Sequence, residues 1–289
     1  MFHRNTKAVL AAAVLTAALL TGCVQPEPPA AKPTETQAYE GPTVQLMVPV
    51  SAVCHLPDGR LNWHLTCRYD RLGNLVRVIR HGPNGGVEDD YSYLYDRQGR
   101  ITRISSQDGL DAVQYTYDVS GSRVRELHGL ERLENTYDIR GNMQLTDRYN
   151  SDILEQYTTY TYNSEGYLAL AQNFDSSGQL LSHYSYEYDE NGHMLRQRFY
   201  TKSGVLPSVI EYTYDDSGNL IREVDYDRAG RIRSDIHYSC DSRGHRLAAS
   251  RYDEAGKVLW WVEFSYGQVP VPEANRDANI SARREILGF

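Results

Sequence analysis

A Tyr-Asp dipeptide, with Gly three residues after the Asp, recurs along this chain and constrains its fold more than any other feature. Full copies begin at Tyr69, Tyr95, Tyr117, Tyr137, Tyr188 and Tyr214, and degenerate copies begin at Tyr162 and Cys240. Successive glycines of the eight copies are 20 to 26 residues apart. Self-similarity at such a period is typical of an array of one supersecondary unit.

Each unit reads as two strands. A second turn signal, such as Asp227-Arg-Ala-Gly230, lies near the middle of each interval. Between turns the residues alternate: Tyr184, Tyr186 and Tyr188 share one face, whereas Ser185 and Glu187 share the other. A period of two indicates half-buried β-strands. Eight units of two therefore predict about sixteen antiparallel strands.

The repeated Asp and Gly residues fit a structural role in turns. Asp at the first turn position accepts hydrogen bonds from backbone amides two residues on, and Gly supplies a positive φ. Calcium requires six to eight converging oxygens, which one carboxylate per turn does not supply. We therefore expect turn-forming residues, and no metal site, at Asp70, Gly73, Asp96, Gly99, Asp118, Gly121, Asp138, Gly141, Asp189, Gly192, Asp215 and Gly218.

The strand number limits the shape of the sheet. Open twisted sheets rarely exceed about ten strands without curling or splitting, and a circular barrel of about sixteen strands leaves a lumen that these side chains cannot fill. We predict an all-β fold of tandem antiparallel hairpins in a long coiled or flattened-barrel sheet. The chain has 23 Tyr and only 5 Phe. We expect the tyrosine rings inside, where their hydroxyls need partners; the alternative is a stacking surface for sugars or peptides.

The repeats resemble the Rhs/YD-repeat superfamily. The resemblance is clearest at Tyr93-Leu-Tyr95-Asp96-Arg-Gln-Gly99-Arg-Ile101 and at Tyr212-Thr-Tyr214-Asp215-Asp-Ser-Gly218-Asn-Leu220, and it covers residues 65–266. It implies a coiled β-shell and a non-catalytic scaffold, with no catalytic residue to carry over. The large bacterial members enclose a toxin, and this chain is far shorter, with no recognisable toxin segment after its repeats.

The N-terminus is typical of a targeting segment. Arg4 and Lys7 precede an apolar stretch that is too short for a comfortable membrane span. Its end, Leu20-Thr21-Gly22-Cys23, resembles the bacterial lipobox, which implies cleavage after residue 22 and lipidation of Cys23. Two or more acyl chains give stable anchoring. Val24, rather than Asp, favours the outer membrane by the same resemblance. Residues 23–45 are rich in Pro and indicate a tether.

Charge narrows the class of partner. The chain has a formal charge of −8, and loss of Arg4 and Lys7 with residues 1–22 brings it to −10 (−8 minus 2). An acidic protein disfavours nucleic acid and anionic lipid as partners. We expect attachment to the membrane through the lipid and a ligand that is a protein or a glycan.

Three cysteines remain after Cys23. The bacterial periplasm permits disulfides, and we predict a bond between Cys54 and Cys67. Pairing of Cys67 with Cys240, or a buried free thiol at Cys240, is the alternative. His55 and His64 flank the same hairpin, but their spacing to these cysteines matches no closed zinc site. We expect no metal and no cofactor.

The sequence predicts four segments: a signal peptide (1–22), a tether (23–45), a repeat domain (46–267) and a C-terminal tail (268–289), in which we expect a short helix that caps a sheet edge. No phosphate-binding loop, nucleophile elbow or zinc-protease helix is present. We therefore expect a non-enzymatic, lipid-anchored envelope scaffold. Trp261 is the candidate contact residue, because Trp260 shares the face of Val258 and Val262 and its neighbour must point the other way; the alternative is that the C-terminal tail covers both tryptophans. The alternative function is a glycan-active periplasmic enzyme that uses carboxylates in a Tyr-lined cleft.

Overall fold

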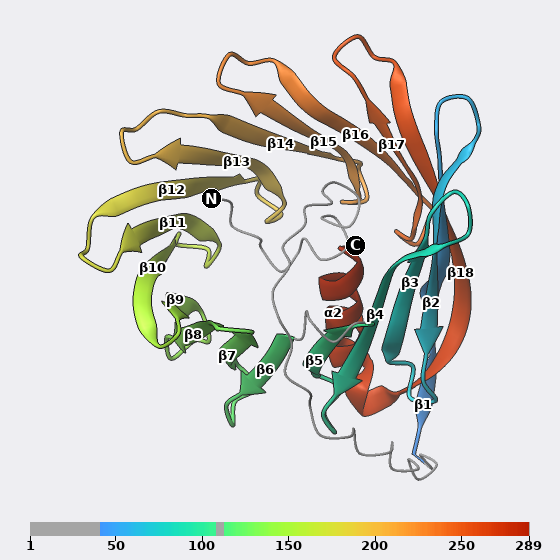
Figure 1. Ribbon diagram of the computed structural model, residues 1–289, viewed down its shortest axis with the longest axis horizontal. Coiled ribbons are helices and arrows are strands. Elements are labelled where there is room, and N and C mark those ends of the chain that lie inside the picture. The colour runs from blue at the N-terminus through green and yellow to red at the C-terminus, as the bar shows by residue number, and fades with distance from the viewer. Residues whose placement is uncertain (1–40, 108–112, 289) are drawn as a thin grey trace.

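The chain folds into one antiparallel sheet that closes on itself. The structure is a computed structural model and describes residues 41–107 and 113–288. Each strand pairs with the next one along the chain, and the first strand, β1 (Thr43–His55), also pairs with the last, β18 (Val258–Pro272). Every described strand therefore has two neighbours, and the strands form a ring (Figure 1).

Sixteen further strands and a C-terminal helical segment complete the described chain. The strands are β2 (Leu61–Tyr69), β3 (Leu75–His81), β4 (Val87–Tyr95), β5 (Ile101–Ser106), β6 (Val113–Tyr117), β7 (Arg123–His128), β8 (Glu131–Tyr137), β9 (Met143–Asn150), β10 (Ile153–Tyr162), β11 (Leu168–Asp175), β12 (Leu180–Tyr188), β13 (Met194–Thr201), β14 (Ser208–Tyr214), β15 (Leu220–Asp227), β16 (Ile232–Cys240) and β17 (Arg246–Tyr252). A 3₁₀ turn, η1 (Glu273–Asn275), leads into the helix α2 (Arg276–Leu287).

The predicted all-β fold of tandem hairpins is confirmed, with eighteen strands instead of about sixteen. The two additional strands, β1 and β18, lie outside the eight repeat units, and their mutual pairing closes the ring. That pairing runs from Thr43 opposite Pro272 to His55 opposite Trp261. β1 thus begins within the predicted tether, and β18 extends past the predicted end of the repeat domain. Closure removes the unpaired strand edges that invite aggregation.

The repeated Asp-Gly turns share two hydrogen bonds from backbone amides to the Asp carboxylate. In a representative turn, Oδ1 of Asp215 accepts from the backbone N–H of Ser217 at 2.9 Å and of Asn219 at 2.8 Å, and Oδ2 accepts from the Asn219 side chain. Gly218 closes this turn with a φ of 81°, and a Cβ atom there would lie 2.8 Å from Nε2 of His193 in the preceding turn. Glycine is therefore required both by the backbone and by the close stacking of turns.

The tyrosine of each repeat ties its hairpin to the preceding one. Its hydroxyl donates to a backbone carbonyl 14 to 20 residues earlier, at 2.6 to 3.0 Å. Tyr95, for example, donates to the carbonyl of Leu75 and Tyr188 to that of Leu168. These bonds let a tyrosine ring be buried with its hydroxyl satisfied. Cys240 occupies the tyrosine position before the eighth turn, so Leu220 lacks the phenol donor that the pattern supplies elsewhere.

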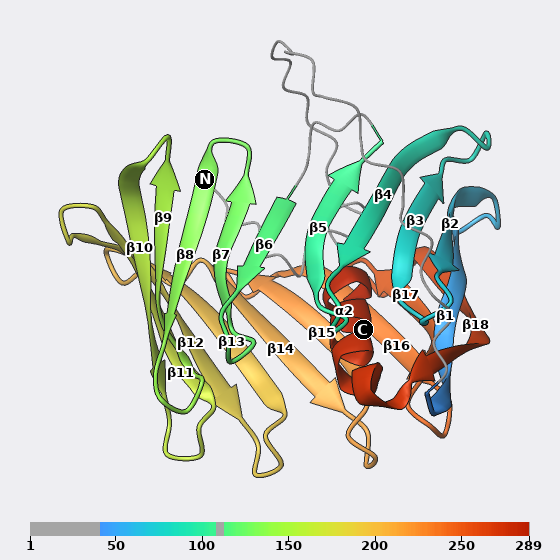
Figure 2. The ribbon, with the colours of Figure 1, turned by 90° about the horizontal axis from the view of Figure 1, so that it is seen from below.

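The C-terminal helix fills one side of the ring. Ala282, Ile286 and Leu287 of α2 join a buried cluster that includes Trp63, Leu65, Tyr93 and Ile104. Both views show α2 inside the ring against β4 and β5 (Figures 1 and 2). We call β1–β5, β18 and α2 the filled sector. The sequence predicts that a helix caps a sheet edge, but a closed ring leaves no such edge, and the helix packs inside.

Polar contacts fix α2 in this position. Nη2 of Arg123, on β7, lies 2.7 Å from Oε2 of Glu285. Deeper in the structure, the side chain of the buried Asn279 donates to Oδ1 of Asn74 at 3.0 Å and accepts from Arg283. A buried cation such as Arg283 is stable only where its donors are used. The helix is therefore held by specific bonds as well as by apolar packing.

The predicted disulfide between Cys54 and Cys67 is wrong. Both thiols are free, as is that of Cys240. In the β1–β2 register Cys54 lies opposite Trp63, four residues from Cys67 along the strand. At about 3.3 Å per residue this offset is roughly 13 Å, well beyond the separation of about 7 Å that a disulfide bridges. Burial raises the pKa of the Cys54 thiol to about 11 and that of Cys67 to about 12.

Candidate ligand cavity inside the ring

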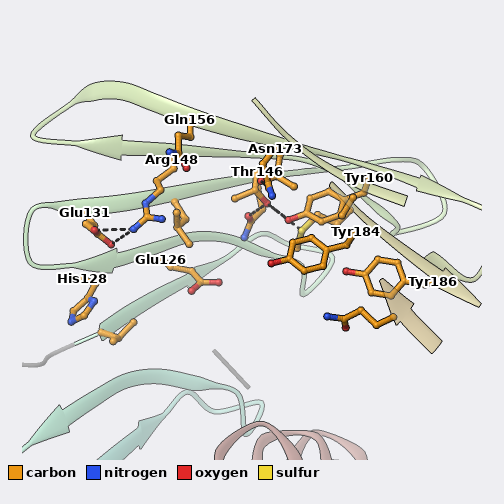
Figure 3. Close-up of a pocket in the computed structure, with 17 residues that line it drawn as sticks. Glu126, His128, Glu131, Thr146, Arg148, Gln156, Tyr160, Asn173, Tyr184 and Tyr186 are labelled. Carbon is orange, nitrogen blue, oxygen red and sulfur yellow. Dashed lines mark hydrogen bonds and ion pairs between the residues drawn. The ribbon is translucent and has the colours of Figure 1, made fainter. Parts of the chain in front are cut away.

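The ring contains a cavity on the side that α2 does not reach. Its volume is about 620 Å³, and we call the strands that supply most of its wall, β7–β13, the cavity sector. Figure 3 shows the side chains of these strands pointing into the cavity. The lining residues are mostly polar or aromatic: Val113, Glu126, His128, Glu131, Leu133, Asn135, Met143, Thr146, Arg148, Gln156, Thr158, Tyr160, Ala171, Asn173, Tyr184, Tyr186 and Gln197.

The wall of the cavity is held by side-chain hydrogen bonds that cross the strands. Thr146 on β9 donates to Asn135 on β8 at 2.9 Å. Thr158 on β10 donates to Asn173 on β11 at 2.8 Å, and Asn173 donates to Ser182 on β12 at 2.9 Å. Asn135 and Asn173 are both buried. Buried polar groups that are satisfied in this way make a rigid surface. The cavity wall is therefore preorganised for binding.

Two neighbouring tyrosines give the cavity an aromatic end. Tyr184 and Tyr186 are two residues apart on β12, so both rings stand on the inner face of the sheet. Tyr184 also packs against Phe199 on β13, with the ring centroids 4.9 Å apart. Burial raises the pKa of both phenols above the ordinary value, and they stay protonated at neutral pH. They therefore present hydroxyl groups that can donate and accept hydrogen bonds.

The opposite end of the cavity carries charged residues. Nη2 of Arg148 lies 2.9 and 3.0 Å from the two carboxylate oxygens of Glu131, and Figure 3 places this pair near Gln156 and His128, away from the tyrosines. Because the two charges neutralise each other, this end offers little net attraction to either anions or cations.

Glu126 is a carboxylate that lines the cavity at the boundary with the filled sector. Its Oε1 lies 3.7 Å from Nη1 of Arg123, the residue that also binds Glu285 of α2. Burial raises the pKa of Glu126, and the nearby Arg123 opposes part of that shift. A half-neutralised, desolvated carboxylate in a cavity is a functional-site candidate.

The residues singled out from the sequence lie outside this cavity. Trp261 is half-buried and stacks on His55, with ring centroids 5.2 Å apart, while its neighbour Trp260 packs against the core. The turn-forming Asp and Gly residues lie at one rim of the ring. Cys23 lies outside the described residues, as do the signal peptide and most of the tether.

The cavity residues are not among those that the sequence singles out. A signal was nevertheless present: inward-facing positions of β8–β11 include polar residues (Asn135, Thr146, Thr158 and Asn173), whereas Leu65, Tyr93 and Ile104 stand at buried positions of β2, β4 and β5. A polar residue at an inward-facing position of a strand indicates that the interior there is accessible to water.

Within residues 41–107 and 113–288, no group of three or more His, Cys, Asp or Glu side chains is arranged to hold a metal ion. In the same part of the chain, no helix is both long enough and apolar enough to cross a membrane.

Solved structures that resemble this chain include three distant ones. A porin-like protein from Bacteroides uniformis ATCC 8492 is 11% identical, with a TM-score of 0.41, over 78% of this chain and 99% of that one. A porin-like protein from Bacteroides vulgatus ATCC 8482 is 12% identical, with a TM-score of 0.36, over 76% and 98%. The TcdB2-TccC3-Cdc42 complex is 11% identical, with a TM-score of 0.20, over 73% of this chain and 18% of that one. At these TM-scores the likenesses support no functional argument.

The sequence itself places the chain in a family. No curated protein matches it. The Teneurin YD-shell family, however, matches residues 57–261, which is most of the chain and nearly all of the ring. The repeated Tyr-Asp turns and the tyrosine-to-carbonyl bonds lie within the matched residues. This chain belongs to the Teneurin YD-shell family.

Proposed function

We propose that this protein is a non-enzymatic binding scaffold of the bacterial cell envelope, and that the cavity sector holds its ligand, a protein segment or a glycan. The observation that carries the proposal is the uneven filling of the ring: one sector is packed by α2, and the other encloses about 620 Å³. This volume lies within the range of about 300–1,000 Å³ that is usual for ligand sites.

The cavity's construction supports binding over catalysis. Its polar wall groups, including Asn135 and Asn173, are bonded to one another across strands, which gives a preorganised surface. Preorganisation reduces the free-energy cost of ordering side chains when a ligand binds.

Attachment to the membrane is part of the same proposal and rests on the sequence. Leu20-Thr21-Gly22-Cys23 resembles a lipobox, and acylation of Cys23 would anchor the ring to the outer membrane through the Pro-rich segment. In cells that express the full chain, we expect the wild type in the membrane fraction and Cys23→Ser in the soluble fraction. Equal partition of both forms into the membrane fraction contradicts lipid anchoring.

The binding role is tested by recovering partners from the organism's own envelope. The wild type, a Tyr184→Ala/Tyr186→Ala double variant and Trp261→Ala are compared as bait. If the cavity is the site, the double variant loses the partner and Trp261→Ala keeps it. Loss with Trp261→Ala alone moves the site to the outer face of the ring and refutes the cavity.

A second candidate function is a glycan-active enzyme, and one observation favours it. Glu126 and Glu131 both line a cavity that contains tyrosines, and the pKa of Glu126 is raised, as in a general acid. Glycosidases need two carboxylates across a cleft, but Glu131 is engaged by Arg148. Release of reducing sugar from envelope glycan by the wild type, but not by Glu126→Gln, supports the enzyme over the scaffold.

A further inference from the structure

Several hydrogen-bonding groups in the cavity have no protein partner. Among the described residues, the hydroxyls of Tyr184 and Tyr186 and the side-chain amides of Gln156 and Gln197 bond to no other side chain or backbone group. Hydroxyl and amide groups can each both donate and accept. Unpaired groups of this kind in a concave site mark where a ligand supplies the missing partners.

The charge of the cavity favours a neutral ligand. Arg148 is neutralised by both carboxylate oxygens of Glu131, and Glu126 faces Arg123 at 3.7 Å. Among the described lining residues, the Arg side chain is therefore paired and does not attract a polyanion, and the formal charge of −8 on the whole chain also repels one. Uncharged groups that both donate and accept hydrogen bonds remain, and sugar hydroxyls are such groups.

A slot lies between two of the cavity tyrosines. Ala171 on β11 is opposite Tyr160 on one side and Tyr184 on the other, so the two tyrosines stand two strand spacings apart, or about 9.6 Å. Each ring also has a contact on its other side: the Tyr160 hydroxyl lies 3.2 Å from Thr146 on β9, and Tyr184 packs against Phe199 on β13. In this register only the small side chain of Ala171, which is buried and lines the cavity, stands between the two tyrosines.

We propose that the cavity binds a neutral oligosaccharide, with one sugar ring over Ala171 between Tyr160 and Tyr184 and its hydroxyl groups bonded by Tyr186 and Gln197. This inference rests on the proposed binding function and names its ligand class. The apolar C–H faces of a sugar ring pack on tyrosine rings, which combine a large apolar area with a polar tip. Sugar hydroxyls both donate and accept, so they complement the phenol and amide groups that the protein leaves unpaired.

Binding of defined probes tests the inference. Maltohexaose and chitohexaose are titrated calorimetrically into the wild type, Ala171→Phe, Tyr184→Ala and Tyr200→Ala. Ala171→Phe fills the slot, and Tyr200 serves as the matched control because it lies on the outer face of β13, where it stacks on His183. We expect at least one neutral hexasaccharide to bind the wild type, a loss of at least tenfold for Ala171→Phe and Tyr184→Ala, and a change below twofold for Tyr200→Ala. The melting temperature verifies that each variant is folded.

Charged and peptide probes distinguish failure of this inference from failure of the proposed function. A heparin hexasaccharide that binds more tightly than both neutral sugars overturns the inference. Neutral hexapeptides that bind the wild type and are lost with Ala171→Phe, in the absence of sugar binding, also overturn it, although the cavity then remains the ligand site. If no sugar, peptide or native envelope partner responds to Ala171→Phe, both the inference and the proposed function fail.

Discussion

The filled sector and the cavity sector are built from the same repeat, yet one is packed and the other encloses a cavity. Both use the Asp-Gly turn, and in both a tyrosine binds the carbonyl of the preceding unit: Tyr95 to Leu75 in the filled sector and Tyr188 to Leu168 in the cavity sector. They differ in the middle of their strands. Leu65 and Ile104 face α2 in one sector, whereas Thr146 and Asn173 face the cavity in the other.

This difference separates two roles within each repeat. Residues at the strand ends, next to the turns, join hairpins into a shell whatever the shell contains. Residues at the strand centres decide whether the interior excludes water. Apolar centres bury α2, which stabilises the ring through the hydrophobic effect, and polar centres keep a site open for a ligand.

The largest expected effect concerns the packed interior. Leu65 is 5% exposed in the filled sector, whereas Leu195, on β13, is 41% exposed. Leu65→Ala should lower the free energy of unfolding by about 2–5 kcal/mol, because it removes buried apolar area and leaves a cavity. Leu195→Ala should change it by less than about 1 kcal/mol. Urea denaturation followed by circular dichroism measures the free energy of unfolding of both variants. Equal decreases for the two would contradict a packed sector and an open one.

A smaller effect is expected from the bonds that join neighbouring hairpins. Tyr188→Phe removes the hydroxyl that donates to the Leu168 carbonyl at 3.0 Å and should cost about 1 kcal/mol, because the acceptor loses its partner. Tyr186→Phe, two residues away, removes a hydroxyl that faces the cavity and should be nearly neutral. If Tyr186→Phe proves the more destabilising change, the roles assigned to strand ends and strand centres are reversed.

Cys240 offers a test in the direction of increased stability. It stands where the other units have the bonding tyrosine, twenty residues after Leu220, which is the spacing of the bonds from Tyr214 to Met194 and from Tyr266 to Arg246. Cys240→Tyr should restore a donor for the Leu220 carbonyl and raise the free energy of unfolding by up to about 1 kcal/mol. The denaturation midpoint should rise with an unchanged slope. A lower midpoint would mean that the eighth unit is packed differently from the rest.

The smallest effect concerns the turns that the two sectors share. The pKa of Asp241 is lowered from 3.8 to about 2, chiefly by the hydrogen bond from His245 and next by backbone amides. A lowered folded-state pKa stabilises the fold above the unfolded value, and this contribution is lost as the pH falls toward the folded value. In His245→Ala the pKa of Asp241 should rise, as measured by NMR titration. The variant should be less stable than the wild type above about pH 4, and this difference in the free energy of unfolding should shrink between about pH 4 and pH 2. A deficit that is constant with pH contradicts the pairing.

The local parts of this structure were predictable from the sequence, and the long-range parts were not. The spacing of Asp215 and Gly218 predicts a turn, and the alternation of Tyr184 and Tyr186 predicts a strand, because each depends on neighbouring residues. The pairing of β1 with β18 joins residues more than two hundred positions apart, and no local pattern specifies it. The apolar residues of α2, such as Ile286, indicate a buried face without indicating what it packs against.

The cavity could have been predicted only in part. Polar residues at inward positions, such as Asn135 and Asn173, are visible in the sequence, but their significance depends on knowing that the sheet closes around them. The Cys54–Cys67 prediction failed for a related reason. Which residues lie opposite each other is set by the tight turn at Gly59 and the register that follows it, not by the separation along the chain.

The most direct test of the unequal filling of the ring is the rate at which thiols react with a small, water-soluble maleimide. Gln197→Cys places a thiol on the cavity wall, and the native Cys54, 1% exposed, lies in the filled sector. Labelling followed by peptide mass spectrometry should show rapid modification at position 197 and protection of Cys54 until the protein unfolds. Equal rates at the two positions, or a protected thiol at 197, would contradict a ring that is packed on one side and open on the other.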